Sequence, residues 1–268
     1  MAMDHRPSAS FFSEGEPHVD PERLVQHICD RRGITRDQLG VRPAAVGTFN
    51  SRLTQFIATQ ANAEPAEYWI RQNEAAFTEG PAYVDRDSVT IATFPIGAPA
   101  AVTLMEEMIA CGTTSLIVVG AAGSLQPHTP IGSLVVPDAA IREEGTSHHY
   151  APSSDAATPS PRLRLAIEAA LRERGLAYAT GASWTTDAVY REHRGKIDRY
   201  RDAGVMTVEM ELSALFTVAT FRGIECAALL VVSDELHGES WDLGFGGETL
   251  VRAMGQAGLI ALDVARSL

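Results

Sequence analysis

Three segments of the sequence combine residue types that could do chemistry. The first reads LIVVGAAG, an apolar run that ends in small residues, Gly120 and Ala121 among them. Ligands of open α/β sheets bind at the carboxyl ends of strands, and small residues there let a ligand approach the backbone closely. The same residues would also suit a tight turn that binds nothing. A nucleotide-binding P-loop is excluded, because no Gly-Lys-Ser/Thr follows.

The second segment, TVEMELSA, places Glu209 and Glu211 on either side of Met210. Acidic residues in the first turn of a helix interact favourably with its dipole, by about 0.3–1 kcal/mol each. Alternatively, the apolar residues that alternate with the carboxylates, such as Val208, place at least one glutamate near the core. A buried carboxylate needs hydrogen-bond donors, and the two hydroxyls of a ribose diol could supply them. Both interpretations stay open at this point.

The third segment, CAALLVVSDEL, is an apolar run that ends in Ser233 and Asp234. If the run is a central strand, it delivers the aspartate to the carboxyl end of the sheet. Partial burial there favours the protonated carboxyl and would let Asp234 act as a general acid. Serine and aspartate are also good helix N-caps, so a capping role is equally compatible with the pattern.

The elements that must position these segments follow from the hydrophobic pattern. Short apolar runs rich in β-branched residues alternate with helical patterns, and several runs are apolar on both faces, as in a sheet covered on both sides. We therefore expect one α/β domain over residues 21–268, with a central mixed β-sheet flanked by helices. Strands are predicted over 44–47, 89–94, 115–120, 133–136, 179–184 and 226–232, and helices over 21–39, 100–111, 161–174, 208–222 and 248–267.

Two polar stretches are predicted to lie outside the regular elements. Residues 1–20 contain Ser, Pro and Gly and are expected to form a mobile N-terminal arm. The stretch APSSDAATPSP, over 151–161, is expected to be a long surface loop. No repeat and no linker divides the rest of the chain.

Composition excludes several classes of protein. The 268 residues include 22 Lys+Arg and 34 Asp+Glu, for a net charge of −12, which disfavours nucleic-acid binding. The three cysteines are widely spaced and indicate neither a disulfide framework nor a metal site. No apolar run approaches the roughly 20 residues of a membrane helix, and no secretory signal is evident, so we expect a cytoplasmic protein with no membrane partner.

Taken together and in this order, the three segments resemble the nucleoside phosphorylase/nucleosidase superfamily. Its members include uridine phosphorylases, hexameric purine nucleoside phosphorylases and nucleosidases. The similarity extends from about Ile96 to Asp234. In sequence and in motif spacing, it is closest to the uridine phosphorylase branch. The segments WTTDAVY, VEMELSALFTVA and VVSDEL carry the pattern, with Val-Glu-Met-Glu followed by a downstream Ser-Asp.

The resemblance implies roles for residues around the ribose and the base. Glu211 would hold the ribose 2′- and 3′-hydroxyls, Met210 would pack on the sugar, and Asp234 would protonate a purine. His18 would correspond to an N-terminal histidine that reaches the 5′-hydroxyl in a neighbouring subunit. The base would be lined by Thr186, Val189, Tyr190, Val208, Glu209 and Ser233.

The phosphate site departs from the family pattern. Arg52 follows GTFNS, where the family usually reads GDPxR, and would bind phosphate with the turn at Gly120 and Ala121. Arg71 would correspond to an arginine supplied by a neighbouring subunit. Phosphorylases usually carry an arginine where this chain has Val118, and Ser or Thr where it has Ala121. Because the phosphate loop also lacks its usual Gly-Asp, two or three expected phosphate donors are missing.

The base pocket departs from the uridine phosphorylases as well. The Gln and Arg that contact uracil in that branch fall near His193 and Gly195 here, whereas Asp234 belongs to the purine branch. The resemblance assigns no role to His193 or to His149.

We therefore predict a pentosyltransferase: a nucleoside phosphorylase that cleaves a purine nucleoside with inorganic phosphate as co-substrate and without a cofactor or metal. The alternatives are a nucleoside hydrolase that uses water and a non-catalytic nucleoside-binding homologue. The resemblance also implies a homo-oligomer, with a hexamer favoured over a dimer.

Overall fold

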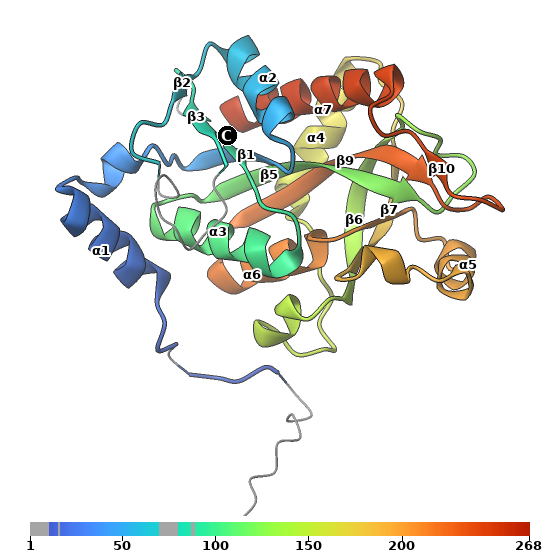
Figure 1. Cartoon of the computed structure of the whole chain (residues 1–268), viewed down its shortest axis with the longest axis horizontal. Coiled ribbons are helices and arrows are strands. Elements are labelled where there is room, and N and C mark those ends of the chain that lie inside the picture. The colour runs from blue at the N-terminus through green and yellow to red at the C-terminus, as the bar shows by residue number, and fades with distance from the viewer. Residues whose placement is uncertain (1–10, 16, 70–79, 87–88) are drawn as a thin grey trace, which may run out of the picture.

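The computed structural model describes residues 11–15, 17–69, 80–86 and 89–268 (Figure 1). It confirms the predicted α/β fold with a mixed central sheet. Within these ranges ten strands follow the order β10-β9-β6-β7-β8-β5-β1-β4-β3-β2. The strands are β1 (Ala44–Thr48), β2 (Glu64–Pro65), β3 (Ala82–Val84), β4 (Val89–Thr93), β5 (Ser115–Ser124), β6 (Leu134–Glu143), β7 (Ala179–Thr186), β8 (Thr207–Glu209), β9 (Glu225–Glu235) and β10 (Asp242–Leu243).

Part of this sheet curls into a ring. Strand β5 pairs in parallel with β9 along its whole length, and its last two residues pair antiparallel with β8. Because β9 also pairs with β6, β6 with β7, and β7 with β8, five strands close on themselves. Strands β1 and β4 extend the sheet outward in parallel with the first half of β5. The carboxyl ends of β1, β4, β5 and β9 therefore meet at one edge.

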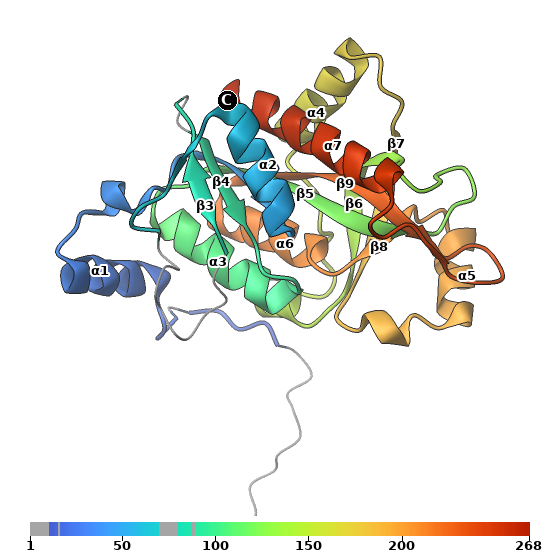
Figure 2. The ribbon, with the colours of Figure 1, turned by 45° about the horizontal axis from the view of Figure 1, so that its top comes forward.

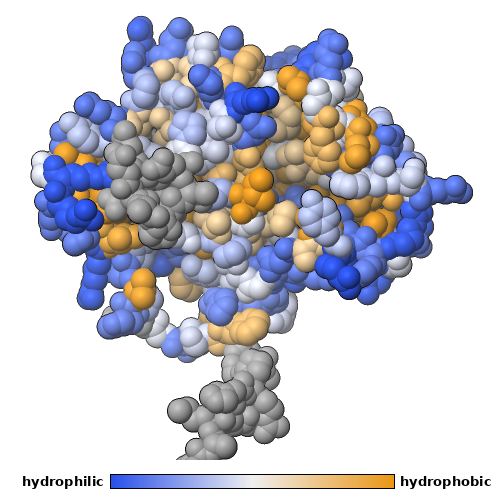
Figure 3. Space-filling view, viewed as in Figure 1, coloured by the Kyte–Doolittle hydropathy of each residue, from blue (hydrophilic) through white to orange (hydrophobic). Residues whose placement is uncertain are grey.

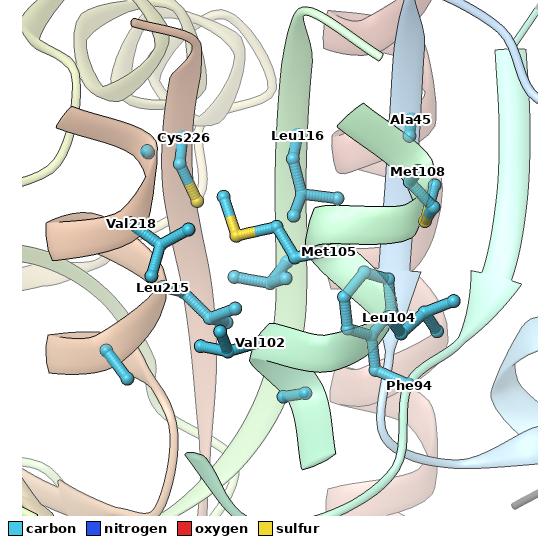
Figure 4. Close-up of a cluster of buried hydrophobic side chains, with 14 of the residues drawn as sticks. Ala45, Phe94, Val102, Leu104, Met105, Met108, Leu116, Leu215, Val218 and Cys226 are labelled. Carbon is cyan, nitrogen blue, oxygen red and sulfur yellow. The ribbon is translucent and has the colours of Figure 1, made fainter. Parts of the chain in front are cut away.

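Helices cover both faces of the sheet, as Figures 1 and 2 show. One face carries α2 (Ser51–Ala61), α4 (Pro161–Glu173) and α7 (Glu248–Arg266), and the other carries α1 (Pro21–Arg32), α3 (Ala98–Ala110) and α6 (Leu212–Arg222). Figure 4 shows the second layer, where Met105 of α3 and Leu215 of α6 meet Leu116 of β5. This two-sided packing explains why the central strands are apolar on both faces.

The predicted helix over 208–222 begins later than expected. Residues Thr207–Glu209 form β8, and α6 begins only at Leu212. The predicted helix over 21–39 is also divided, because Gly33 adopts φ 65° and ends α1. A short 3₁₀ turn, η1 (Arg36–Leu39), follows it.

Two helices escaped the sequence analysis. Helix α2 carries polar residues on its outer face and is capped by the Asn50 side chain, which accepts hydrogen bonds from the N–H groups of Arg52 and Leu53. Helix α5 (Arg194–Asp202) is almost entirely charged or polar, and Ile197 is its one buried residue. Helix α2 does carry an apolar stripe, formed by Leu53, Ile57 and Ala61, which the sequence analysis overlooked, whereas α5 has none.

The two stretches predicted to be irregular contain no long helix or strand in the residues that the structure describes. Residues 151–160 form a loop, joined to the sheet by a bridge between Ala157 and Ala140. Of the predicted arm, residues 1–10 and 16 lie outside the described residues, and the remainder contains no helix or strand. Phe11 stacks on His149 with ring centroids 5.1 Å apart. The mobility of the arm stays a prediction.

Candidate active site

A cavity of about 1590 Å³ opens at the edge where the strand ends meet. It is bounded by the segments that follow β1 and β4, by the ends of β5, β8 and β9, and by the first half of α7. Eleven residues singled out in the sequence line it: Arg52, Gly120, Ala121, Val189, Tyr190, Val208, Glu209, Met210, Glu211, Ser233 and Asp234. Thr186 and His18 do not line the cavity, and Arg71 lies outside the described residues.

A β-bulge presents Asp234 to this cavity. Ala122 pairs with Val232, but the next residue, Gly123, pairs with Asp234, so Ser233 is the extra residue of β9. Bulges next to active sites re-aim a side chain that a regular strand would direct elsewhere. Asp234 is only 7% exposed.

Two donors hold the Asp234 carboxylate in place. The Ser233 hydroxyl donates to Oδ1 at 2.6 Å, and the indole Nε1–H of Trp241 donates to Oδ2 at 2.6 Å. Each donor fixes one oxygen, so the orientation of the carboxyl group is set by its own chain. Each oxygen also keeps a lone pair with which it can meet a ligand.

Gly123 leaves the space that Asp234 occupies. A Cβ atom at this position would clash with Leu236 and would lie 3.2 Å from Asp234 Oδ2. We expect Gly123→Ala to lower the free energy of unfolding by roughly 1–3 kcal/mol through overpacking, and to displace Asp234. Chemical denaturation measures the first effect, and the rate of base release measures the second. Gly195→Ala is the control, because a Cβ there meets nothing within 4 Å; equal stability of the two variants would contradict the prediction.

The two glutamates of the EME segment have different environments. Glu209 accepts hydrogen bonds from the N–H groups of Glu211 and Leu212 at 2.6 and 2.7 Å, and from Thr185 Oγ1 at 2.5 Å. Its carboxylate thus caps α6 from the end of β8. The Ser183 hydroxyl donates to the same carboxyl group at 3.5 Å. The helix-terminus interpretation therefore accounts for Glu209, whose buried carboxyl group accepts four hydrogen bonds.

Glu211 is satisfied less fully. Its Oε1 accepts a hydrogen bond from the Gly97 N–H at 2.5 Å, and the residue is 6% exposed. Burial and the neighbouring charge of Glu209 raise the pKa of Glu211. A carboxyl group with few donors, at the wall of a cavity that Met210 also lines, is the group that a sugar diol would complete.

Arg52 lines the cavity from the first turn of α2. Its guanidinium group makes no hydrogen bond or ion pair with the part of the chain that the structure describes, whereas the cap at Asn50 uses only its backbone N–H. Val118 is buried in the core with Phe94 and contributes nothing to the cavity. Ala121 does line the cavity but has no donor side chain.

Sequence reasoning missed several polar residues of the cavity, among them Glu192, Trp241 and Arg252. Trp241 follows the Ser-Asp pair closely in the sequence. That short separation was the one signal that could have placed it near Asp234. Glu192 follows the short turn η3 (Val189–Arg191), and nothing in its segment REHRG marks it. Burial and the charge of Asp234 raise the pKa of Glu192 to about 7, against the opposing charge of Lys196.

Comparison with known proteins identifies the class to which this fold and cavity belong. Residues 46–266 match the family model of the phosphorylase superfamily, and the chain belongs to that superfamily. The resemblance based on the three segments is thereby confirmed.

Individual relatives refine the comparison. The chain is 27% identical over 162 residues to a uridine phosphorylase of Haemophilus influenzae, and the match covers 55% of this chain and 64% of that one. It is 29% identical over 152 residues to a guanosine phosphorylase of Halorubrum lacusprofundi, covering 57% of this chain and 63% of the relative. The matched region thus spans slightly less than two thirds of these relatives.

Solved structures match over more of the chain. The fold is similar to a uridine phosphorylase of Vibrio fischeri, with a TM-score of 0.74, 26% identity, and coverage of 90% of this chain and 96% of the other. A purine nucleoside phosphorylase of Toxoplasma gondii has a TM-score of 0.75 at 21% identity, covering 86% of this chain and 92% of that one, and shares the fold.

Proposed function

We propose that this protein is a nucleoside phosphorylase, a pentosyltransferase that cleaves the N-glycosidic bond of a purine nucleoside with phosphate. One observation carries the proposal: Asp234, Glu211 and Arg52, which come from three distant segments, line the same cavity. They supply a proton donor, a sugar-binding carboxylate and an anion-binding cation. The family of the chain and the names of its relatives point to the same chemistry.

Each group answers one requirement of the reaction. Asp234 gives a proton to the base, so that the base does not leave as an anion. Glu211 holds the ribose hydroxyls and fixes the sugar while positive charge develops at its ring. Phosphate, held by Arg52 and the backbone of the Gly120 turn, attacks C1′ from the face opposite the base. The products are the free base and ribose 1-phosphate.

The preference for a purine rests on the base end of the cavity. Asp234 offers a carboxyl group that is fixed by Ser233 and Trp241. His193 and Gly195, which stand near the positions of the uracil-contacting residues, do not line the cavity. These features support a purine base, although the relatives include uridine phosphorylases as well as a guanosine phosphorylase.

Hydrolysis by water is the second candidate, and a specific observation favours it. Phosphate is a doubly charged anion that needs charge-assisted partners. Val118 is buried away from the cavity and Ala121 carries no hydroxyl group, so the described cavity wall lacks two donors that phosphorylases use. A non-catalytic homologue is disfavoured, because both Asp234 and Glu211 are present and face the cavity.

The sugar product decides between phosphate and water. A panel of purine and pyrimidine nucleosides is incubated at zero and at saturating phosphate, and the base and sugar are quantified. We expect base release to require phosphate and to yield ribose 1-phosphate. Arg52→Ala should raise the KM for phosphate by roughly 10–100-fold, the value of one charge-assisted hydrogen bond of about 1.5–3 kcal/mol.

A matched control and a contrary outcome make this test decisive. Arg23→Ala removes an exposed arginine of α1 and should leave the KM for phosphate unchanged. Free ribose, formed at the same rate with and without phosphate, would establish the hydrolase instead.

The proposed assembly is a homo-oligomer. Several large apolar side chains that line the cavity are exposed, namely Phe56, Ile96, Trp241, Phe245 and Val251. In the view of Figure 3, hydrophobic surface lies near the middle of the molecule and also toward its left and right sides, among hydrophilic surface. A neighbouring copy would cover such surface and could supply His18 or Arg71 to the site. The hexamer, and the cytoplasmic location, stay predictions.

The proposed reaction needs only the nucleoside and phosphate. Within the described ranges, no cluster of three or more His, Cys, Asp or Glu residues is arranged to hold a metal ion. None of the helices in those ranges combines the length and apolarity that crossing a bilayer requires.

A further inference from the structure

The segment that follows β9 folds back over the end of that strand. The two residues of β10 pair antiparallel with the last two residues of β9. The Gly244 N–H donates to the Ser233 carbonyl at 3.0 Å, and a Cβ atom on Gly244 would lie only 2.6 Å from that oxygen. Trp241 directly precedes β10, so these main-chain contacts hold it beside Asp234.

The side chain of Trp241 has a polar end that is used and an apolar ring that is not. Its indole Nε1–H donates to Asp234 Oδ2 at 2.6 Å, yet the residue is 52% exposed and lines the cavity. The ring meets the ring of Phe245 edge-on, with centroids 6.4 Å apart and planes at 78°. Much of the apolar surface of the indole is therefore left uncovered at the cavity, next to the acid.

The chemistry of the indole group suits a residue that orients an acid. An indole N–H is a hydrogen-bond donor and offers no acceptor for a proton. Trp241 can therefore fix the carboxyl group of Asp234 without competing for the proton that the leaving base must receive.

The hydrogen bond also places the base relative to the indole ring. A base nitrogen that meets Asp234 Oδ2 at an ordinary hydrogen-bond distance lies within about 6 Å of the indole nitrogen, because both atoms contact the same oxygen. A nitrogen that meets Oδ1 lies only the width of a carboxyl group farther away. Planar aromatic rings contact each other when their centroids are about 4.5–7 Å apart. A base that receives a proton from Asp234 is therefore within contact range of the uncovered ring.

We propose that Trp241 forms a wall of the base site and is also the positioning residue of Asp234. One side chain would then hold the purine and orient the acid that protonates it. The inference rests on the proposed function and deepens it, because it assigns base recognition to the connection between β9 and β10. The base nitrogen takes the electron pair of the glycosidic bond and the proton of Asp234, while the indole keeps its own proton.

Two substitutions separate the donor from the ring. Trp241→Phe keeps an aromatic ring and removes the N–H group, so kcat for an unmodified purine nucleoside should fall roughly 10–100-fold, as expected for a misplaced catalytic group. Its KM should stay within about twofold of the original value, because the ring contact remains. Trp241→Leu removes the ring as well, and should in addition raise KM about tenfold through the loss of stacking on the base.

The substrate distinguishes positioning of the acid from a general loss of structure. A purine nucleoside methylated at N7 has a base that leaves without protonation, so Trp241→Phe should cleave it within about twofold of the original rate. Damage to the fold would lower the rates on both substrates equally. An equal loss on both, or an unchanged KM in Trp241→Leu, would overturn the inference.

Phe221 of α6 offers a matched control. Its ring is 53% exposed and meets Tyr150 edge-on, with centroids 5.4 Å apart, but it does not line the cavity. Phe221→Leu should leave kcat and KM unchanged for both substrates. A loss in Phe221→Leu as large as that in Trp241→Phe would show that the effect does not depend on the cavity.

Tryptophan fluorescence tests the contact with the base without turnover. Of the three tryptophans in the chain, Trp69 and Trp184 are 4% and 0% exposed, so acrylamide in solution should quench mainly Trp241. Trp241→Phe should lose this quenchable emission, which assigns the signal. Saturating hypoxanthine, a free purine base, should protect the emission of the unaltered protein from acrylamide, and calorimetry measures its binding.

The possible results of this titration separate the inference from the proposed function. Binding of hypoxanthine without protection of Trp241, or no binding of hypoxanthine, would overturn the inference. If hypoxanthine protects Trp241 but no nucleoside is cleaved, the proposed function fails and the assignment of Trp241 to a base site stands.

Discussion

Replacing Asp234 by Asn should reduce the cleavage of unmodified purine nucleosides by about 10²–10⁴-fold, the usual contribution of a positioned general acid. An amide group can still accept a hydrogen bond from Trp241 or Ser233, so the fold and the shape of the cavity should be retained. The measurement is kcat for base release at saturating phosphate, together with the unfolding temperature of both proteins.

The substrate provides the internal control for this variant. An N7-methylated purine nucleoside has a base that leaves without protonation, so Asp234→Asn should cleave it with a much smaller loss. Asp202→Asn, at the exposed end of α5, serves as the matched variant and should lose nothing. Near-normal cleavage of unmodified nucleosides by Asp234→Asn would show that the acid lies elsewhere.

Glu211→Gln should weaken nucleoside binding and turnover together. The carboxylate is proposed to accept two hydrogen bonds from the ribose diol, each worth roughly 1.5–3 kcal/mol, so the loss of both lowers affinity by about 10²–10⁴-fold. Free base lacks the diol and should bind nearly as before. Calorimetry with nucleoside and with free base, on the same protein, measures both affinities.

A structural role for Glu211 would give a different pattern. If the carboxylate only supports the Gly97 loop through its hydrogen bond to that N–H, base and nucleoside should lose affinity equally. Glu239→Gln, at the exposed rim, should change neither affinity and controls for the lost charge.

Much of this architecture could be predicted from the sequence. The six predicted strands all occur, because runs such as CAALLVVS are apolar on both faces and fit only a strand covered from both sides. The position of Asp234 at the edge of the sheet was predictable for a related reason. A polar residue at the end of a buried strand lies where that strand leaves the core. The helices over 161–174 and 248–267 were predicted within a residue of their observed ends, owing to their apolar stripes.

The parts that escaped prediction depend on contacts between distant segments. Strand β8 has three residues, and its pattern merges with that of the helix that follows, so only its pairing with β5 and β7 defines it. The capping role of Glu209 depends on that strand. Glu192 and Asp234 line one cavity although they follow or end elements far apart in the chain, η3 and β9, and no local pattern encodes that arrangement.

The ring of five strands has a consequence for how the protein acquires its site. Its closure joins β5 to β9 and to β8, strands separated by long stretches of chain, and such non-local pairing makes folding slow. Gly123 pairs with both Val208 and Asp234, so the ring closes at the very residues that frame the cavity. A nascent chain that has not yet produced β9 lacks Asp234 and the strand that closes the ring. Asp234 and Glu211 are therefore expected to reach their places in the cavity together, when the ring closes.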